Sequence, residues 1–457
     1  MQYDGYAYIH TIGCQMNVVD SQKLAAVLNA WGFCRTRNPD QADIIVCNTC
    51  AIRHKAEEKA FSFLGQFARE KQKRPGLFTV MAGCVAQQEG KNAFKRLPHL
   101  DLVIGTQAFS RFGKHIDALK SGRRQIVDTA PSDIIFEAMP CSTGSDENPV
   151  SRFVTIMEGC DNFCTYCVVP YVRGRERSRS WESIVKEIRV LADSGVREVT
   201  LLGQNVNSYG AKDGGITFAR LLEKVAHIDK IERIRFATSH PKDLSADLIE
   251  AMAGLDKVCS HLHLPVQSGC DRILRKMNRG YTRDTYLARI DDLKRAIPDI
   301  ALSTDIIVGF PSETESDFEE TLDLVDRVGF DSIFAFAYSD RSSAPASKFG
   351  NPVDEKEKME RLNRLLACQE TITQEKNDHL TGRVVAVLVE GISAKLHEGF
   401  VKTTENTRQM TGRTAANKIV HFPSDIHEIG DLADIRIENA YPHSLWGAPV
   451  EQTSHEN

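Results

Sequence analysis

The sequence predicts an α/β protein with an N-terminal parallel α/β sheet domain, a central partial (β/α)6 barrel and a small C-terminal antiparallel β-barrel. Three observations support this prediction. The first 125 residues alternate strand-like and helix-like segments, as in a parallel sheet with crossover helices. The same alternation resumes at residue 152 and continues through six strand–helix repeats. Beyond residue 380 short strand-like segments divided by turns remain, which is typical of a small closed barrel.

The N-terminal domain is expected over residues 5–125. Its predicted strands are AYIHTI (7–12), DIIVC (43–47), LFTVMA (77–82) and DLVIG (101–105). Its predicted helices cover residues 21–32, 56–73 and about 88–96. Residues 126–150 are rich in Pro, Ser, Gly and acidic side chains, and this composition predicts a linker.

The central barrel is expected over residues 151–378. Its predicted strands are RFVTIM (152–157), EVTLLG (198–203), RIRFAT (233–238), CSHLHLPV (259–266), LSTDIIVG (302–309) and SIFAFAY (332–338). Helices are predicted at about 181–194, 217–229, 245–254, 282–296 and 313–328, followed by a long charged helix at about 354–379. The C-terminal domain, expected over residues 379–446, has predicted strands at 384–391, 409–414, 418–422 and 432–440.

The bulk composition is that of an ordinary globular protein. The 457 residues are 42% hydrophobic and 26% charged, and the net charge is -5, so a global basic field for nucleic acid is excluded. The first residues, MQYDGYAYIH, lack the basic and apolar regions of a signal peptide. No apolar run approaches the length that crosses a bilayer. We therefore expect a cytoplasmic protein without a membrane partner.

Three cysteines follow the first predicted barrel strand with the spacing CxxxCxxC. Cys160, Cys164 and Cys167 lie where a barrel carries its chemistry, at the carboxyl end of a strand. A structural zinc site normally has four ligands, and no nearby Cys or His provides the fourth. Three thiolates suit an iron–sulfur cluster with one open iron, where a cofactor or substrate binds. The alternatives are incidental cysteines and a closed zinc site with a distant fourth ligand.

Three further cysteines each follow a predicted strand of the N-terminal domain. Cys14, Cys50 and Cys84 are distant in sequence, but the carboxyl ends of parallel strands share one edge of a sheet. They therefore predict a second three-thiolate site, with ordinary buried cysteines as the alternative. Cys47 competes with Cys50, and we favour Cys50 because it falls in the loop rather than inside the strand.

Four arginines crowd the segment that follows the CxxxCxxC motif. Arg173, Arg175, Arg177 and Arg179 are interrupted by a single acid, Glu176. This pattern predicts a patch for RNA phosphates or bases beside the active face. The alternative is a solvated charged loop.

Long stretches of the chain resemble the radical S-adenosylmethionine (SAM) methylthiotransferase family. The N-terminal stretches are TIGCQMNVVDS (11–21), CNTCAIRHKAEEK (47–59) and MAGCVAQ (81–87). Those in the barrel are EGCDNFCTYCVVPYVRGRERSR (158–179), LLGQNVNSYG (201–210), ATSHP (237–241), HLPVQSG (263–269), MNRGYTR (277–283) and TDIIVGFPSETESDFEET (304–321). GRTAANKIVHF (412–422) and AYPHSLWG (440–447) resemble the family's TRAM domain. Two departures are Cys270, where the family has serine, and YSDRSSAPAS (338–347).

The resemblance implies two [4Fe-4S] clusters, an auxiliary one on Cys14, Cys50 and Cys84 and a SAM-binding one on the CxxxCxxC cysteines. It implies that two SAM molecules convert a C2–H bond of a modified adenosine into C2–S–CH₃, in the anticodon loop of tRNA. It also implies a reducing electron donor of the flavodoxin or ferredoxin type and a monomeric enzyme. Its SAM contacts are expected from groups at strand ends, each of which could instead cap a loop. These groups belong to Gln204, Asn205, Ser239, His240, Gln267 and Gly309.

Three alternatives remain open at the level of sequence. The GCQMN and RGRERSR stretches most resemble family members that act on N6-dimethylallyladenosine. Other members act on threonylcarbamoyl-adenosine in tRNA or on an aspartate of a ribosomal protein. An alternative of another class is a non-catalytic RNA-binding protein with structural metal sites, which predicts closed coordination and no cleavage of SAM.

Overall fold

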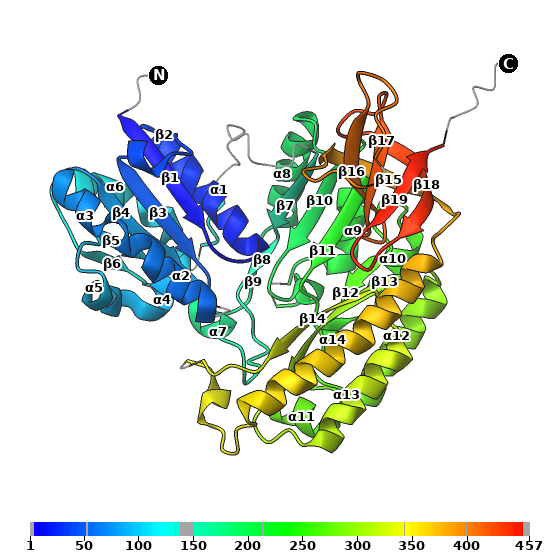
Figure 1. Cartoon of the computed structure of the whole chain (residues 1–457). Helices are drawn as coiled ribbons and strands as arrows, with labels where there is room; N and C mark the ends of the chain where they lie inside the picture. Colours follow the sequence, from blue (N-terminus) through cyan, green and yellow to red (C-terminus); the bar gives the residue numbers. More distant parts are fainter. Residues whose placement is uncertain are drawn as a thin grey trace.

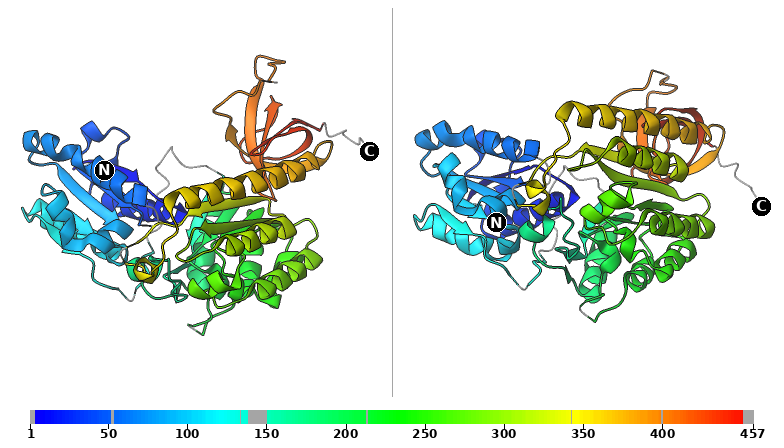
Figure 2. Two further views of the ribbon diagram at one scale, coloured as in Figure 1. Left: turned by 60° about the horizontal axis from the view of Figure 1, so that its bottom comes forward. Right: turned by 90° about the horizontal axis from the view of Figure 1, so that it is seen from below.

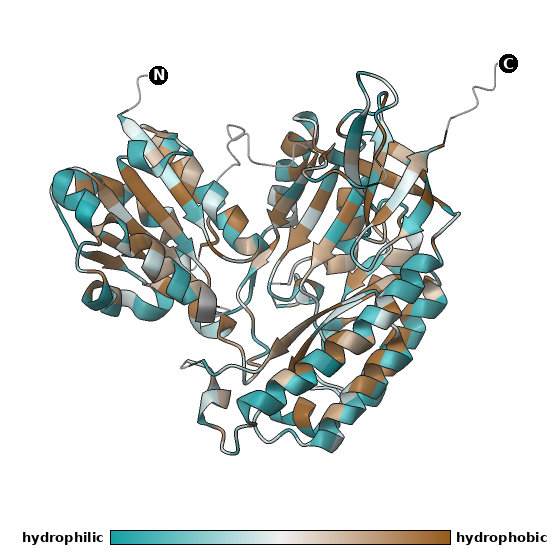
Figure 3. Ribbon diagram, viewed as in Figure 1, coloured by the Kyte–Doolittle hydropathy of each residue, from teal (hydrophilic) through white to brown (hydrophobic). Residues whose placement is uncertain are grey.

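The computed structural model describes residues 4–51, 54–132, 134–137, 150–212, 214–341, 343–398 and 400–450. In this part of the chain no helix is both long enough and apolar enough to cross a membrane. The described residues form three domains along the chain, with the N-terminal and C-terminal domains on opposite sides of the central one (Figures 1 and 2). Strands are largely hydrophobic, whereas helices carry hydrophilic residues on their outer sides (Figure 3).

The N-terminal domain is a six-stranded parallel sheet in the order β2-β1-β3-β4-β5-β6. Its strands are β1 (Gly5–Thr11), β2 (Phe33–Arg35), β3 (Ile44–Thr49), β4 (Phe78–Gly83), β5 (Leu102–Ile104) and β6 (Ile126–Asp128). Its helices are α1 (Gln15–Ala30), α2 (His54–Gly65), α3 (Phe67–Lys73), α4 (Cys84–Glu89), α5 (Ala93–Arg96) and α6 (Phe112–Lys120). Strand β3 is buried along its whole length, because apolar side chains from two separate groups of helices cover the sheet.

Two strands of this sheet are absent from the sequence prediction. Both β2 and β6 are three-residue edge strands, too short for a periodic pattern. Strand β6 also uses residues 126–128, the start of the segment expected to be a linker. Within that segment, residue 133 and residues 138–149 lie outside the described residues.

The central domain contains the six predicted strands as a curved parallel array. They are β7 (Ser151–Thr155), β10 (Glu198–Leu202), β11 (Arg233–Ala237), β12 (His261–His263), β13 (Ala301–Val308) and β14 (Ser332–Ala337). Two three-stranded sheets, β7-β10-β11 and β12-β13-β14, are joined by a parallel bridge between Ile234 and Val258. A short antiparallel ribbon of β8 (Met157–Glu158) and β9 (Arg177–Ser178) brackets the cysteine loop.

Helices cover the outer side of this array. They are α8 (Trp181–Asp193), α9 (Phe218–Ala226), α10 (Ala246–Gly254), α11 (Asp271–Lys276), α12 (Arg283–Ala296), α13 (Glu315–Val328) and α14 (Glu355–Asp378), whereas the short helix α7 (Val169–Val172) packs on α4 of the N-terminal domain. Helices α8, α9, α12 and α13 each begin after a Ser or Thr whose side chain accepts a hydrogen bond from a first-turn amide. This cap satisfies an amide that lacks a partner within the helix, so the sequence sets these boundaries locally.

The C-terminal domain is a closed five-stranded barrel in the order β15-β16-β17-β19-β18. Its strands are β15 (Val384–Ile392), β16 (Arg408–Thr414), β17 (Ile419–Ser424), β18 (Leu432–Ala440) and β19 (Leu445–Pro449). The fifth strand, LWGAP, is absent from the prediction because its Gly and Pro read as turn residues. Strand β19 pairs in parallel with β17, and all other pairs in this barrel are antiparallel.

The C-terminal barrel contacts the amino ends of the central strands. Arg233 and Arg235, near the start of β11, donate hydrogen bonds to four carbonyl oxygens of the C-terminal domain at 2.5–3.0 Å. Arg235 is buried and also pairs with Glu198, the first residue of β10, at 2.9 Å. The N-terminal domain instead contacts the carboxyl ends, where Met16 and Val19 of α1 pack on Leu202. The chemistry-bearing face of the central strands is therefore turned towards the N-terminal domain.

Replacing Arg233 with Met is expected to loosen the C-terminal barrel. The guanidinium donates to Arg413 O at 2.5 Å and Ala386 O at 3.0 Å, and hydrogen bonds from a charged donor contribute about 1.5–3 kcal/mol each. We expect amide hydrogen exchange in β15 and β16 to accelerate about tenfold or more. The exposed Arg220→Met variant is the control and should leave the exchange unchanged. Equal exchange in the Arg233 variant would show that apolar packing alone holds the barrel.

Candidate active site

The structure brings Cys14, Cys50 and Cys84 to one edge of the N-terminal sheet. Cys14 directly precedes α1, Cys50 directly follows β3, and Cys84 is the first residue of α4. A hydrogen bond from Cys50, together with nearby Arg173, lowers the pKa of Cys14 to about 6 although burial opposes this. Burial raises the pKa of Cys84, and Arg173 opposes that rise. Cys47 lies fully buried inside β3, and burial raises its pKa.

A buried amide network ties these three loops together. Asn17 Nδ2 donates to Thr49 O at 3.1 Å, and Asn17 Oδ1 accepts from both the amide and the thiol of Cys14 at 3.4 Å. Asn48 Nδ2 donates to Asn17 O at 2.8 Å. Thr49 Oγ1 bridges to the next strand, donating to Ala82 O at 2.5 Å and accepting from Val85 N. The positions of the three cysteines are therefore set by side chains that neighbour them in sequence.

The second cysteine group lies on the loop between β8 and α7. Burial raises the pKa of Cys160 to about 11 and that of Cys167 to about 12, so both are neutral thiols until a metal displaces the proton. Arg279, which is buried, approaches Cys164 Sγ at 3.4 Å and donates to Pro265 O at 2.6 Å. This buried cation would offset the negative charge of thiolates.

Neither cysteine group has the spacing of a site for a single ion. Among the described residues, one group of three potential ligands, Cys270, Asp317 and Glu320, has its atoms within 4.8 Å of one another. There, however, Asp317 is already engaged by Arg272, Thr314 and the Cys270 thiol. Wider spacing within the cysteine groups suits a cluster, in which each thiolate binds a different iron.

The second cysteine loop is flanked by residues that contact the N-terminal domain. Val168 and Val172, which flank and end α7, pack in the same apolar cluster as Cys84 and Ala344. Lys23 on α1 pairs with Glu158 at 3.5 Å, beside the start of the second cysteine loop. The residues after Cys167 thus lie against the edge that carries Cys84.

Several groups expected to contact a cofactor have the polar atoms for it. Buried Asn205 Oδ1, Ser239 Oγ and His240 Nε2 have no hydrogen-bond partner among the described residues. Burial lowers the pKa of His240, so its imidazole is neutral. Unpaired buried polar atoms are rare in folded proteins, and these three follow β10 and β11 at the face where a polar ligand binds. The residues present therefore fit a polar cofactor such as SAM.

The other three expected residues have structural partners. Gln204 Oε1 accepts from Gly159 N at 2.5 Å and so supports the cysteine loop. Gln267 has a left-handed φ of +76°, and its backbone pairs with β13. Gly309 N donates to Glu313 Oε2 at 2.6 Å.

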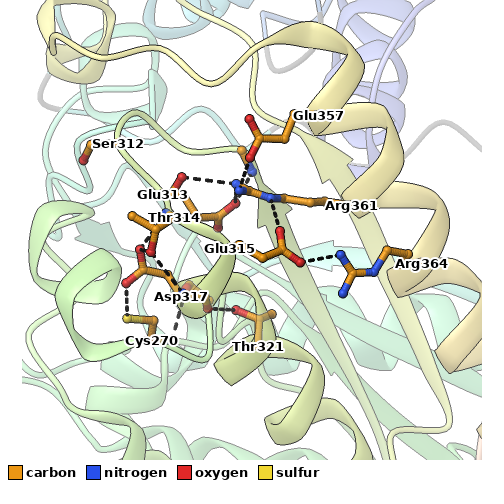
Figure 4. A network of polar contacts seen from close by, with 12 residues as sticks. Cys270, Ser312, Glu313, Thr314, Glu315, Asp317, Thr321, Glu357, Arg361 and Arg364 are labelled. Carbon is orange, nitrogen blue, oxygen red and sulfur yellow. Dashed lines mark hydrogen bonds and ion pairs between the residues drawn. The ribbon is translucent and has the colours of Figure 1, made fainter.

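A buried ion pair supports the loop that follows β13 (Figure 4). Arg361 on α14 donates to Glu313 Oε2 at 2.9 Å, and both side chains are 1% exposed. Arg361 also pairs with Glu315 and Glu357, which lie nearer the surface. Burial raises the pKa of Glu313, and the Gly309 amide and Arg361 oppose that rise. Helix α14 thereby holds Gly309 at the carboxyl end of its strand.

The four arginines do not form the exposed patch that the sequence predicted. Arg173 and Arg179 are buried in ion pairs, with Asp20 at 2.6 Å and Glu187 at 2.7 Å respectively. Arg177 is largely covered and pairs with Glu158. Arg175 is 74% exposed and lies over the ring of Phe163 at 5.4 Å. Arg173 caps the end of α7 and only Arg177 lies in the two-residue strand β9, so the four arginines do not follow one strand and their spacing gave no shared face.

The chain matches three families of domain. Residues 154–325 match the radical SAM superfamily, residues 6–105 match the uncharacterized protein family UPF0004, and residues 379–450 match the TRAM domain. The radical SAM methyltransferase TsrM from Kitasatospora setae has a similar fold, with a TM-score of 0.58 at 11% identity over 75% of each chain. The cobalamin-dependent enzyme OxsB has a TM-score of 0.53 at 14% identity over 81% of this chain and 56% of its own. These structural likenesses show the fold alone.

The fold, the cysteine loop and these matches define a radical SAM protein with an added α/β domain and a TRAM barrel. Proteins of this superfamily use SAM together with a [4Fe-4S] cluster. Two relatives are named tRNA-2-methylthio-N(6)-dimethylallyladenosine synthase. The one from Desulfosudis oleivorans is 52% identical, and the match covers 97% of this chain and 96% of the relative. The one from Syntrophus aciditrophicus is 47% identical, and the match covers 99% of this chain and 96% of the relative. The chain belongs to the family of tRNA-2-methylthio-N(6)-dimethylallyladenosine synthases.

Two residues of the site were not singled out in the sequence. Asn17 and Arg279 lie inside the quoted stretches TIGCQMNVVDS and MNRGYTR, so their neighbours were the available signal. Arg173 was singled out, but for a surface role. Its contact with Asp20 joins two domains, which no local pattern indicates.

Gly159→Ala is expected to disrupt the CxxxCxxC loop. Gly159 has a φ of +79°, and a Cβ there would lie 2.0 Å from Arg175 O. The left-handed backbone costs a non-glycine residue roughly 1–2 kcal/mol, and the clash must move the backbone beside Cys160. We expect the iron bound through this loop to fall severalfold after anaerobic reconstitution, measured by iron and sulfide content. Gly254→Ala, on a helix end with open space, is the control; equal iron in both variants would contradict the prediction.

Proposed function

We propose that this protein methylthiolates carbon 2 of N6-dimethylallyladenosine next to the anticodon of tRNA. The observation that carries the proposal is the pair of three-cysteine groups, each following strands of a parallel sheet, with α7 after the second group packed against the edge that carries Cys84. A reaction that replaces an aromatic C–H by C–S–CH₃ needs both a radical and a source of sulfur. The names of the relatives supply the substrate.

We assign a SAM-binding [4Fe-4S] cluster to Cys160, Cys164 and Cys167, and an auxiliary [4Fe-4S] cluster to Cys14, Cys50 and Cys84. When bound, these groups and two SAM molecules supply the radical that removes the C2 hydrogen and the methylated sulfur that replaces it. Asn205, Ser239 and His240 bind SAM through their unpaired polar atoms. Arg279 balances the charge at Cys164, and Gln204 orients the loop through Gly159.

Contacts with RNA are assigned to two separated surfaces. Arg175 and Phe163 form an exposed cation–aromatic pair beside the second cysteine loop, suited to stacking on an unpaired base of the anticodon loop. The TRAM barrel is docked at the opposite ends of the central strands, so it binds a part of the tRNA away from the reacting base. A flavodoxin- or ferredoxin-type electron donor, a monomeric state and a cytoplasmic location complete the proposal.

Nucleoside mass spectrometry tests the substrate. Cells lacking the protein should lose 2-methylthio-N6-dimethylallyladenosine from bulk tRNA and accumulate N6-dimethylallyladenosine, and the full-length protein should restore the product. Loss of the methylthio form of threonylcarbamoyl-adenosine instead, or of a methylthiolated aspartate in a ribosomal protein, would replace the substrate but retain the chemistry.

Anaerobic reconstitution tests the chemistry itself. The full chain should take up about eight irons, which corresponds to two four-iron clusters. It should form 5′-deoxyadenosine from SAM under reducing conditions. Uptake of zinc with no cleavage of SAM would support a non-catalytic RNA-binding protein.

A further inference from the structure

A buried ion pair joins the central and N-terminal domains beside the N-terminal cysteines. Arg173 directly follows α7 in the central domain, and its Nη2 donates to Asp20 Oδ2 on α1 at 2.6 Å. The two side chains are 6% and 2% exposed. Helix α7, which Arg173 caps, packs on α4, which begins at Cys84, so the guanidinium lies close to the Cys84 thiol and its charge also acts on Cys14. One domain thus places a fixed positive charge against two cysteines of the other.

The position of this arginine is held from several sides. Arg173 N donates to Val169 O at 2.8 Å, and Thr106 Oγ1 donates to the carbonyl of the preceding Val172 at 2.6 Å. Val172 itself packs in the cluster that contains Cys84. The charge of Arg173 is therefore held inside the protein, whereas Arg175 pairs with Asp161 at the surface and is 74% exposed.

Stability alone does not explain a charged pair at this place. Removing two charges from water carries a large desolvation cost, and well-packed apolar residues of similar volume often stabilise a protein as much or more. Asp20 is the anion paired with Arg173, yet the other side of the guanidinium faces thiols rather than a second carboxylate. This arrangement suits a site where negative charge accumulates on sulfur.

We propose that Arg173 raises the reduction potential of the auxiliary cluster and that Asp20 lowers it. The inference rests on the proposed function, because it assumes a cluster on Cys14, Cys50 and Cys84. One-electron reduction adds a negative charge to a cluster that thiolates already make negative. A buried cation stabilises the reduced form and a buried anion destabilises it, and low local polarity strengthens both effects. The central domain thereby adjusts the redox state of the cluster in its neighbour.

Redox titration of a chain that carries only the auxiliary cluster tests this inference. The background is the full-length C160A/C164A/C167A variant, reconstituted anaerobically and followed by electron paramagnetic resonance as the potential is lowered. Adding Arg173→Met should lower the equilibrium constant for reduction of the cluster at least tenfold. For a one-electron couple this is a fall of about 59 mV in the reduction potential. Adding Asp20→Asn should shift the potential in the opposite direction. Arg173→Lys, which keeps the charge, should stay nearer the background value than Arg173→Met.

The opposite signs separate an electrostatic role from a structural one. A residue that merely shaped the site would lower cluster content in both variants and shift neither potential in a charge-dependent way. Arg175→Met, an exposed arginine of the same segment, is the matched control and should leave the potential unchanged. If the background chain binds no cluster, the proposed function fails. If the cluster forms but Arg173→Met and Asp20→Asn leave its potential unchanged, this inference fails and the cluster assignment stands. If Arg173→Met no longer binds the cluster, the Asp20→Asn variant alone tests the inference. A rise in its reduction potential supports the inference, and an unchanged potential contradicts it.

Discussion

Cys84→Ala is expected to abolish formation of the methylthiolated nucleoside while the enzyme still cleaves SAM to 5′-deoxyadenosine. Cys84 begins α4 at the edge of the N-terminal sheet, outside the CxxxCxxC loop of the central domain. Losing a residue that only supports a metal ligand typically lowers metal affinity or activity by about 10–100-fold. Losing a ligand itself should therefore lower product formation by at least about 100-fold. The variant keeps the three cysteines of the proposed radical-forming site. Liquid chromatography with mass spectrometry of both products measures the two activities in one reaction.

Two further variants complete that experiment. Cys160→Ala should abolish both products, because radical formation precedes any change at the nucleoside. Cys47→Ala is the matched control, since Cys47 is a buried thiol inside β3 rather than at its end. It should retain both products, whereas Cys50→Ala should behave like Cys84→Ala. If Cys47→Ala and not Cys50→Ala loses the methylthiolated product, our choice between these two cysteines is wrong.

Arg361→Met should strongly destabilise the central domain. It removes the partner of Glu313, leaving a buried carboxylate beside Gly309 without its compensating charge. Breaking a buried ion pair in this way costs about 3–5 kcal/mol. For a domain of this size that corresponds to a fall of roughly 10 °C in Tm. Differential scanning calorimetry of the full chain, combined with hydrogen exchange in α13 and α14, measures the effect.

The surrounding residues offer two internal controls for this prediction. Arg364→Met lies one turn along α14 and removes surface pairs with Glu315 and Glu319, which should cost no more than about 1 kcal/mol. A Glu313→Gln and Arg361→Met double variant removes both charges and should recover part of the lost stability. A double variant that is less stable than Arg361→Met alone would falsify the view that the unpaired carboxylate causes the loss.

The central strands illustrate what could be predicted before the structure. Each is an apolar run between turn signals, and each is followed by a helix. Four of the helices in this domain begin at a Ser or Thr cap. These signals are local, so a reading of neighbouring residues finds them. The strands β2, β6 and β19 lacked such signals, because pairing with neighbouring strands rather than a pattern in their own residues forms them.

The arginine segment illustrates what local reading could not supply. By spacing and charge, the four arginines at 173, 175, 177 and 179 could not be told apart. The structure nevertheless buries Arg173 and Arg179 and exposes Arg175. The difference arises from partners distant in sequence, such as Asp20 and Glu187. Likewise, nothing beside Gly309 in the chain indicated that Arg361 on α14 would hold its loop.

The sequence by itself determined the domain order, the parallel sheets and the six cysteines that follow strands, because period, caps and strand ends are properties of neighbouring residues. Only the tertiary structure decided that Cys14, Cys50 and Cys84 are joined through Asn17 and Thr49, and that α7 lies against their edge. It also decided which arginine meets thiols and which meets solvent. The physical reason is that burial and charge pairing depend on contacts made when distant segments pack, and these contacts leave no periodic mark in the chain.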